Sequence, residues 1–510
     1  MSSPVPAVQT PSDDACYNAL AAKDARFDGR FFVGVTSTDI YCRAVCSAKL
    51  PKRENCRFFE SAAVAEAAGF RPCLKCRPEL APGVPVHYQN DRLAQRAADM
   101  IRSGRHGGRI AAVAADLRIS ERQLRRLFES VYGTTPAQYR GTCRLLLAKS
   151  LLTDTDLPVS RIAYSCGFSS LRQFNNAFQH WYRLSPSSLR KHSVRSASSS
   201  GSDAIVVHIG YRPPYRFDVL CTFLGARAIV GVETVSGGSY ARTLRCDTDG
   251  GDKQCTGWIR VEDLAEKNRL RLTVSSGLAD VLPLVLAKTR RLFDTDCLPD
   301  AVDAGLSGFH ARAGDAFRIP GIRVPGCADG FEMAVRAILG QQITVKAANT
   351  LTGRVAREFG SQIETPFDGL STMFPQPEDF CTPDAEERLG ALGVIRQRSH
   401  AICALAHSLR SGEIVLEPGA DTSEMRGKLL ALPGIGDWTL QYLLMRAYND
   451  PDALPSTDYA VKQAFPGSSR AEIETIAERW RPWRSYAVLS LWCTPHGIPD
   501  DTPHDMPQTK

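Results

Sequence analysis

The chain has 510 residues, more than one hydrophobic core usually supports, so we expect three or four domains. Hydrophobic residues make up 43% of the sequence and charged residues 23%, which is typical of globular protein. The first sixteen residues lack a basic segment followed by an apolar one, and no run of eighteen apolar residues occurs. Secretion and a membrane span are therefore not expected. The net charge of +7 permits a nucleic-acid partner without requiring one.

Changes in composition divide the chain into unlike parts. The stretch KHSVRSASSSGSD predicts a flexible linker over 193–203, and PELAPGVPVHYQN separates two modules upstream of it. Downstream, β-branched runs give way to apolar residues at three- and four-residue steps. The expected fold is multidomain α+β, with a cysteine-rich α/β module over 1–80, an all-α module over 91–192, a small mixed α/β subdomain over 204–282 and a helical bundle over 283–498.

Two cysteine pairs lie near the N-terminus, in YCRAVC and RPCLKC. Cys42 and Cys46 form a C-x3-C pair, and Cys73 and Cys76 follow after 26 intervening residues as a C-x2-C pair. Such pairs can form disulfides, a structural metal site or a reactive site. We expect a cytoplasmic protein, in which disulfides are disfavoured. The two short chelating loops then predict a tetrahedral four-thiolate site, for which zinc is the favoured metal.

The residues around these cysteines resemble a known family. The run FFVGVTSTDIYCRAVCSAKLPKRENCRFFESAAVAEAAGFRPCLKCRPE is similar to the zinc domain of the Ada methylation-response family, over residues 14–80. The resemblance implies that Cys42 is both a zinc ligand and the acceptor of a methyl group from a DNA methylphosphotriester, while Cys46 is structural. Methylating one thiolate would remove a negative charge and so raise DNA affinity. Ala44 departs from the family, which usually has proline there.

The module over 91–192 contains one pattern twice. The copies read IAAVAADLRISERQLRRLFESVYGTTPAQYR and VSRIAYSCGFSSLRQFNNAFQHWYRLSPSSLRK. Each has an apolar helix, a turn, an amphipathic helix and a closing aromatic residue, and the pair resembles the AraC-family double helix-turn-helix domain. This implies a monomeric transcriptional activator that binds promoter DNA, with RNA polymerase as a partner. Core residues should be Leu124, Leu127, Phe128, Phe174 and Phe178. Side chains expected on DNA bases or phosphates are Arg122, Arg125, Arg126, Arg172, Gln173 and Asn176.

A tight turn, Leu432-Pro433-Gly434-Ile435-Gly436, lies between two helical patterns. Gly434 and Gly436 permit a hairpin whose backbone N–H groups face a DNA phosphate, although a hairpin used only for packing would look the same. Asp458 follows 22 residues after Gly436, either as a functional carboxylate or as a cap of the next helix. Nearby aromatic residues that can build a pocket are Trp438, Tyr442 and Trp492.

The hairpin and the delayed aspartate resemble the helix-hairpin-helix DNA glycosylases. From Ile209 to Ile498 the chain is similar to the AlkA family of 3-methyladenine glycosylases, including YRPPY, ARAIVGVETV, LAKTRRLFD, VRAILGQQ and RWRPWRSYAVLSLW. The resemblance implies hydrolysis of an N-glycosidic bond, in which Asp458 stabilises an oxocarbenium-like sugar and orients or deprotonates water. The aromatic pocket would hold a flipped, positively charged alkylated base through stacking and cation–π attraction.

The same resemblance limits the chemistry. Trp438 stands where bifunctional glycosylases have a lysine nucleophile, so we expect no Schiff base and no strand cleavage. Gln342 takes the DNA-wedge position, and Gln342 or Ile343 would fill the space that the flipped base leaves. Neither an iron–sulfur centre nor an organic cofactor is expected. The sequence thus predicts an alkylation sensor, activator and monofunctional glycosylase acting on double-stranded DNA. The alternative is a regulator whose glycosylase-like half is non-catalytic.

Overall fold

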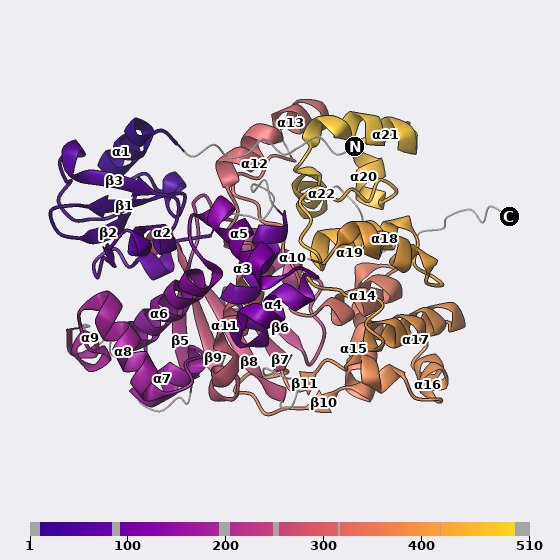
Figure 1. Cartoon of the computed structure of the whole chain (residues 1–510). Helices are drawn as coiled ribbons and strands as arrows, with labels where there is room; N and C mark the ends of the chain where they lie inside the picture. The colour runs from indigo at the N-terminus through magenta and orange to yellow at the C-terminus, as the bar shows by residue number, and fades with distance from the viewer. Residues whose placement is uncertain are drawn as a thin grey trace. The chain divides into compact units, whose positions relative to one another are not determined.

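The computed structural model describes residues 11–83, 92–192, 204–247, 254–314, 317–418 and 420–494. The linker predicted at 193–203 and the end of the predicted bundle, 495–498, lie outside these ranges. The chain divides into two compact units, one made of residues 1–213, 245–290 and 295–298, the other of residues 214–244, 291–294 and 299–510. The expected multidomain α+β fold is confirmed (Figure 1). None of the helices in the described ranges is long and apolar enough to span a membrane.

The cysteine module, in the first unit, is a four-stranded sheet with the order β3-β1-β2-β4. Strand β1 pairs antiparallel with β2 and β3, while β2 pairs parallel with β4. Because parallel neighbours end at the same edge of a sheet, the segments that follow β2 and β4 meet there. The elements are α1 (Asp13–Ala22), β1 (Phe32–Val35), β2 (Ile40–Arg43), β3 (Cys56–Phe59), α2 (Ala62–Ala67) and β4 (Arg71–Pro72).

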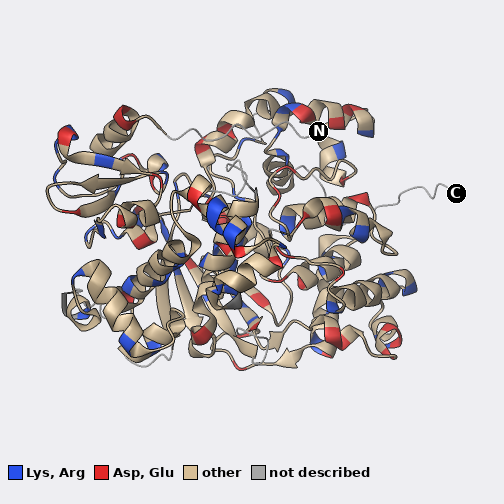
Figure 2. Ribbon diagram, viewed as in Figure 1, with Lys and Arg blue, Asp and Glu red and all other residues tan. Residues whose placement is uncertain are grey.

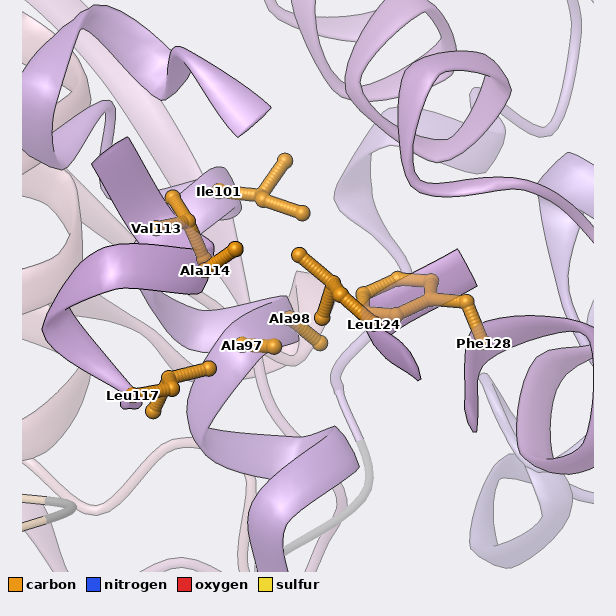
Figure 3. Close-up of a cluster of buried hydrophobic side chains, with 8 residues drawn as sticks. All are labelled: Ala97, Ala98, Ile101, Val113, Ala114, Leu117, Leu124 and Phe128. Carbon is orange, nitrogen blue, oxygen red and sulfur yellow. The ribbon is translucent and has the colours of Figure 1, made fainter. Parts of the chain in front are cut away.

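The next seven helices form the repeated module of the first unit. They are α3 (Arg92–Arg102), α4 (Ile110–Asp116), α5 (Glu121–Tyr132), α6 (Pro136–Asp154), α7 (Val159–Ser165), α8 (Leu171–Tyr182) and α9 (Pro186–His192). Figure 3 shows Leu124 and Phe128 of α5 packed with the buried residues of α3 and α4. Phe174 and Phe178 are fully buried at the matching positions of α8. Leu127 differs from expectation, because it is only partly buried.

Buried polar contacts join the cysteine module to α6. Glu66 accepts hydrogen bonds from the hydroxyls of Tyr41 at 3.0 Å and Thr142 at 2.5 Å. Arg77, directly after the last paired cysteine, donates two hydrogen bonds to Asp154, at 2.7 and 2.8 Å. Buried polar groups are costly without partners, so these bonds specify one way of docking the module on α6.

The mixed α/β segment contributes strands to both units. In the first unit, β5 (Ala204–Gly210) and β8 (Gln254–Leu264) pair antiparallel with the two edges of β9 (Arg269–Ser275). In the second unit, α10 (Phe217–Gly225) is followed by a hairpin of β6 (Glu233–Ser236) and β7 (Ser239–Asp247), and β7 continues from one unit into the other.

The rest of the second unit is mainly helical, with α14 at its core. Residues Phe331 to Leu339 of α14 are buried except for the partly buried Arg336. Arg336 pairs with Glu233 of β6 at 2.8 Å, and Arg242 of β7 pairs with Glu332 at 2.5 Å, so each of these charges has a partner. Helix α11 (Leu282–Leu292) belongs to the first unit up to Arg290. The elements of the second unit that follow are α12 (Pro299–Gly305), α13 (Ser307–Ala313), α14 (Gly330–Leu339), α15 (Val345–Phe359), β10 (Ser361–Gln362), β11 (Thr372–Met373), α16 (Ala385–Ala391), α17 (Arg396–Arg410), α18 (Thr422–Ala431), α19 (Asp437–Arg446), α20 (Tyr459–Ala464), α21 (Arg470–Ala477) and α22 (Arg484–Cys493).

Candidate functional site

The four paired cysteines meet at the edge of the sheet where β2 and β4 end. The Sγ atoms of Cys42, Cys46, Cys73 and Cys76 all lie within 4.8 Å of one another. Four Zn–S bonds of about 2.3 Å in tetrahedral geometry would place the sulfur atoms about 3.8 Å apart. The four Sγ atoms would therefore need to move only slightly closer together to bind one ion. Backbone N–H groups of Arg43 and Lys75 donate to the Sγ atoms of Cys76 and Cys73, each at 3.3 Å. This donor set fits a soft divalent cation.

Two other cysteines of the module stay outside the cluster. Cys16 and Cys56 are buried, and burial is the main cause that raises the pKa of both thiols, that of Cys16 to about 11. A thiol that stays protonated at neutral pH is a poor ligand and a poor nucleophile. Ala44, between Cys42 and Cys46, is fully buried against Cys16 and Phe31, so packing holds the loop although proline is absent.

The amphipathic helices of the two repeats, α5 and α8, present exposed polar side chains. On α5, Arg122, Arg125 and Arg126 are exposed, and Figure 2 marks the basic positions of this helix in blue. Arg125 pairs with Glu129 one turn later at 2.9 Å, which holds its guanidinium on the helix surface. On α8, Arg172 and Asn176 are also exposed. These side chains are therefore accessible to a duplex.

Gln173 has a local role in the structure. Its side-chain oxygen accepts hydrogen bonds from the backbone N–H and the hydroxyl of Ser169, at 3.3 and 2.9 Å. Gln123 does the same for Ser120 at the start of α5, so the two glutamines close equivalent helix ends. The position on α8 that corresponds to Arg125 is Asn175, fifty residues later, and its side chain is exposed. Asn175 was not among the candidate DNA contacts expected from the sequence. Alignment of the two capped helix starts would have revealed it.

Asp458 lies at the start of α20, in contact with two of the expected pocket residues. Its Oδ2 accepts a hydrogen bond from Nε1 of Trp438, and its Oδ1 accepts one from Nε1 of Trp492, both at 2.9 Å. Oδ1 also accepts the backbone N–H of Ala460 at 3.0 Å, so Asp458 caps α20 as well. A carboxylate accepts roughly four hydrogen bonds, which leaves one acceptor position, on Oδ2.

Aromatic rings surround this carboxylate. Trp438 and Tyr442 stack at 5.2 Å with 17° between the ring planes, and Tyr442 lies 5.9 Å from Trp492. All three residues are only partly buried, so their rings remain accessible. The structure adds Phe223 of α10, stacked on Trp492 at 6.2 Å and 12°. Phe223 lies just before the ARAIVGVETV motif, and no local spacing connects it with Trp492.

A buried arginine supports the aromatic cluster. Arg446, 2% exposed, donates to the hydroxyl of Tyr442 at 3.1 Å and to the carbonyl oxygen of Pro325 at 2.6 Å. Its guanidinium also lies 5.2 Å from the ring centre of Phe223. Since Arg446 donates to Tyr442, the phenolic proton is available for another acceptor. Sequence reasoning missed this residue because it follows Tyr442 by one helical turn as an apparently ordinary basic position.

The expected wedge residue occupies the turn between α14 and α15. Gln342 is exposed and adopts the left-handed region, with φ of 55°, which directs its side chain outward from a strained turn. Its neighbour Gln341 donates to the carbonyl oxygen of Gly434 at 2.8 Å and to the hydroxyl of Thr439 at 2.9 Å. These bonds hold the turn against the hairpin.

The hairpin glycines differ in what they require. Gly434 has φ of +76°, and a Cβ there would lie 3.0 Å from Cβ of Ala401, so the position demands glycine. Gly436 starts α19 in an extended conformation, and a Cβ there would meet nothing within 4 Å. The turn therefore does not require glycine at position 436. The lack of a side chain there leaves the N-terminus of α19 accessible to a ligand.

Comparison with curated proteins decides the family. Over 491 residues, the chain is 36% identical to the probable bifunctional transcriptional activator/DNA repair enzyme AlkA of Mycobacterium tuberculosis H37Rv, covering 94% of this chain and 96% of that one. The chain belongs to this activator/repair family. Its parts match the family models for the metal binding domain of Ada (15–79), a helix-turn-helix domain (113–192), the AlkA N-terminal domain (206–329) and the HhH-GPD superfamily base excision DNA repair protein (335–482).

Members of the activator/repair family combine parts that exist separately elsewhere. DNA-3-methyladenine glycosylase 2 of Escherichia coli K12 is 38% identical over 293 residues, which cover 58% of this chain and 99% of the relative. The bifunctional transcriptional activator/DNA repair enzyme Ada of the same organism is 33% identical over 133 residues, 26% of this chain and 36% of the relative. The predicted fusion of Ada-type and AlkA-type parts is thereby confirmed.

Proposed function

We propose that this protein senses and repairs DNA alkylation. Its glycosylase half would hydrolyse the N-glycosidic bond of alkylated bases such as 3-methyladenine in double-stranded DNA. Its N-terminal half would accept a methyl group on Cys42 and, once methylated, activate transcription as a monomer that contacts RNA polymerase. The observation that carries the glycosylase proposal is the carboxylate of Asp458, fixed by two indole N–H groups within an accessible aromatic cluster.

In the proposed excision, the flipped base lies among the rings of Trp438, Tyr442 and Trp492. The C1′–N bond breaks, its electron pair leaves with the base, and positive charge develops on the sugar. Asp458 stabilises that charge, and its remaining acceptor position on Oδ2 orients the water that bonds to C1′. The water proton passes to the carboxylate or to the departing base, so the products are a free base and an abasic site.

In the proposed sensing step, Cys42 Sγ attacks the methyl carbon of a methylphosphotriester. An S–CH3 bond forms, the O–CH3 bond breaks, and the electron pair returns to the phosphate oxygen, which leaves a phosphodiester. We propose zinc as the metal, since four thiolates favour it and it would keep the sulfur deprotonated at neutral pH. Nothing in this step regenerates the thiolate, so each chain reacts once.

The loss of one thiolate charge supports the proposed regulation. A face with less negative charge repels phosphates less, so methylation would raise affinity for promoter DNA bound by α5 and α8. Arg122, Arg125, Arg126, Arg172 and Asn176 would contact that promoter DNA. Gln342 and the hairpin at Gly434 and Gly436 would contact the DNA that carries the alkylated base. Gln173 would act mainly by fixing the start of α8.

Asp458→Asn tests the glycosylase proposal. The variant keeps the acceptor oxygen for one indole but lacks the negative charge, so single-turnover release of 3-methyladenine should fall about 10²- to 10⁴-fold. Asp384→Asn, which alters an exposed aspartate outside the cluster, should release base at the wild-type rate. Release by Asp458→Asn at the wild-type rate would overturn the catalytic role of Asp458. A wild-type protein that released no base would instead favour the alternative, a regulator with a non-catalytic glycosylase-like half.

Mass spectrometry tests the sensor proposal. After incubation with methylphosphotriester DNA, one methyl group should be found on Cys42, and Cys42→Ser should acquire none. A methyl group on Cys46, Cys73 or Cys76 would overturn the assignment of the nucleophile. Promoter affinity that is the same before and after methylation would overturn the proposed switch.

A further inference from the structure

A cleft of about 300 Å³ opens beside the cysteine cluster in the first unit. One wall comes from the cysteine module and includes Lys75 and Cys76. The opposite wall is the turn between β8 and β9, which carries Lys267 and Arg269 in the AlkA-type segment. Two segments that belong to different parts of the fusion thus face the same cavity.

The charges of this cleft are unbalanced. Five of its fifteen lining residues are basic, and two, Asp28 and Glu266, are acidic. Two of the basic residues already have carboxylate partners, because Arg43 pairs with Asp28 and Arg77 pairs with Asp154 and Glu79. This leaves three cations and one carboxylate among the lining residues, beside Cys76 of the cysteine cluster.

None of the three remaining cations forms an ion pair with a carboxylate in the described part of the chain, although the charge of Asp154 acts on Arg269 from farther away. Lys75 donates only to the carbonyl oxygen of Ser47, at 3.0 Å, and Lys75 and Lys267 are both exposed. Arg269 is partly buried, and its Nε hydrogen-bonds to no group within the described ranges. Cations held close together without carboxylates favour an anionic ligand with several acceptor oxygens, and a phosphate group has that chemistry.

Close backbone packing fixes the two walls relative to each other within the unit. A Cβ at Gly210, the last residue of β5, would lie 1.9 Å from the carbonyl oxygen of Leu80. Arg212, fully buried, donates to the carbonyl oxygen of Gly83 at 2.7 Å. The backbone carbonyl oxygen of Asn268 accepts a hydrogen bond from the backbone N–H of Tyr211 at 3.0 Å. This bond connects the β8–β9 turn to the same segment. The cleft is therefore a built feature rather than a chance gap between loops.

We propose that this cleft binds a backbone phosphate of double-stranded DNA, contacted by Lys75 from the cysteine module and by Lys267 and Arg269 from the AlkA-type segment. The AlkA-type half thus supplies part of the DNA-binding surface of the sensor. The inference rests on the proposed function only in that DNA is the partner, and it requires neither methyl transfer nor base release. The ligand is a phosphodiester strand rather than a free phosphate.

Lysine footprinting of the zinc-loaded full chain tests the proposal. Acetylation by a reactive ester is followed by mass spectrometry, with and without a short unmodified duplex at a concentration that saturates binding. Lys75 and Lys267 should react several-fold more slowly with DNA, while Lys23, exposed at the end of α1 and outside the cleft, should react equally in both samples. Unchanged acetylation of Lys267 with the duplex bound would overturn the proposal. Equal protection by inorganic phosphate at matched ionic strength would overturn the assignment to a strand.

Charge removal gives an independent readout. Lys267→Gln and Arg269→Gln should each weaken duplex binding and lower the slope of log Kd against log salt by about one unit, the value for one phosphate contact. The matched control is Arg271→Gln, an exposed arginine on the same strand that does not line the cleft, and its slope should be that of wild type. A loss in Arg271→Gln as large as in the other two would overturn the site.

These outcomes are separable from the proposed function. A wild-type protein that released no base and methylated no cysteine would contradict that function, yet protection of Lys267 could still be measured. Conversely, Lys267→Gln should release 3-methyladenine at the wild-type rate when DNA is saturating, because no step of the proposed excision uses Lys267.

Discussion

The ammonium group of Lys149 on α6 donates a hydrogen bond to the carbonyl oxygen of Cys73 at 3.1 Å. It also pairs with Glu79, and both side chains are 2% exposed. Since α6 connects the two helix-turn-helix repeats, the loop that carries two cysteines of the cluster is bonded directly to the helix between these repeats. A movement of the loop that carries Cys73 and Cys76 would therefore act directly on α6 through Lys149.

Lys149→Met should loosen this connection. In this variant the carbonyl oxygen of Cys73 loses its hydrogen-bond donor, and Glu79 keeps only its ion pair with Arg77. Together these losses should lower the local free energy of unfolding by about 2 kcal/mol. Hydrogen exchange at the Cys73–Cys76 loop and at α6 should accelerate about 30-fold. Lys52→Met is the control, because Lys52 pairs with Glu54 on the exposed surface and such pairs contribute little. Equal exchange rates in the two variants would show that Lys149 does not couple the segments.

Glu66 should make the first unit sensitive to pH. Burial is the main cause that raises the pKa of this carboxyl from 4.5 to about 7, against hydrogen bonds from Thr142 and Tyr41. A raised pKa means that the folded state holds the proton more tightly. Protonated Glu66 therefore contributes about 3 kcal/mol to the free energy of unfolding of the first unit. This contribution is fully present below pH 4.5 and is lost as the pH rises through 7. Protection factors for hydrogen exchange of α2 and α6, which are corrected for the intrinsic pH dependence of amide exchange, should be higher at pH 5 than at pH 8. Glu66→Gln should remove this difference, whereas Glu54→Gln, an exposed control, should keep it.

The indole donors to Asp458 should each contribute to base release. Trp438→Phe and Trp492→Phe keep an aromatic ring for stacking but remove one hydrogen bond to the carboxylate. Each should slow single-turnover release of 3-methyladenine by about tenfold, equivalent to about 1.4 kcal/mol. Trp258→Phe on β8 provides the control, since Trp258 lies outside the aromatic cluster. A double variant as fast as wild type would show that the orientation of Asp458 by indoles is irrelevant to the reaction.

Gln342 should show opposite effects on stability and activity. Glycine adopts φ of 55° without the side-chain clash, so Gln342→Gly should raise the free energy of unfolding of its unit by about 0.5–1 kcal/mol. Loss of the side chain should nevertheless slow base release, because Gln342 would no longer fill the space that the flipped base leaves; release at the wild-type rate would assign that role to Ile343. Gln342→Ala loses the same side chain but keeps the strain. Slower release in both variants, with stabilisation in the glycine variant alone, is the expected pattern in thermal melts and single-turnover assays.

Metal removal should loosen the cysteine module. A strong chelator should release about one zinc ion per chain and speed hydrogen exchange of β2 and β4, since a four-thiolate site contributes directly to folding. Cys46→Ser should bind zinc more weakly. Cys16→Ser should retain the ion, because Cys16 lies outside the cluster. Zinc loss from Cys16→Ser equal to that from Cys46→Ser would contradict the ligand set.

Local spacing explains what could be predicted from the sequence. The pairs Cys42/Cys46 and Cys73/Cys76 form chelating loops because ligands three or four residues apart reach one ion. The double helix-turn-helix was recognisable because each copy repeats its own caps and apolar positions, as at Phe128 and Phe178. Gly434 marked a tight turn because only glycine adopts that backbone conformation without strain at close contact. These features depend on a few neighbouring residues, so they can be identified before any tertiary contact is known.

Tertiary packing decided the rest. The sequence left Asp458 as either a helix cap or a functional carboxylate, and the structure shows that it caps α20 while accepting hydrogen bonds from Trp438 and Trp492. Gln173, expected on DNA, closes a helix end, and Phe223 joins the aromatic cluster from a distant helix. The cleft at Lys267 likewise arises only when the β8–β9 turn packs near the cysteine module. The sequence alone determined which chemical groups the chain carries and their local turns, whereas long-range packing decided which groups meet, because partners far apart in the chain leave no periodic signal.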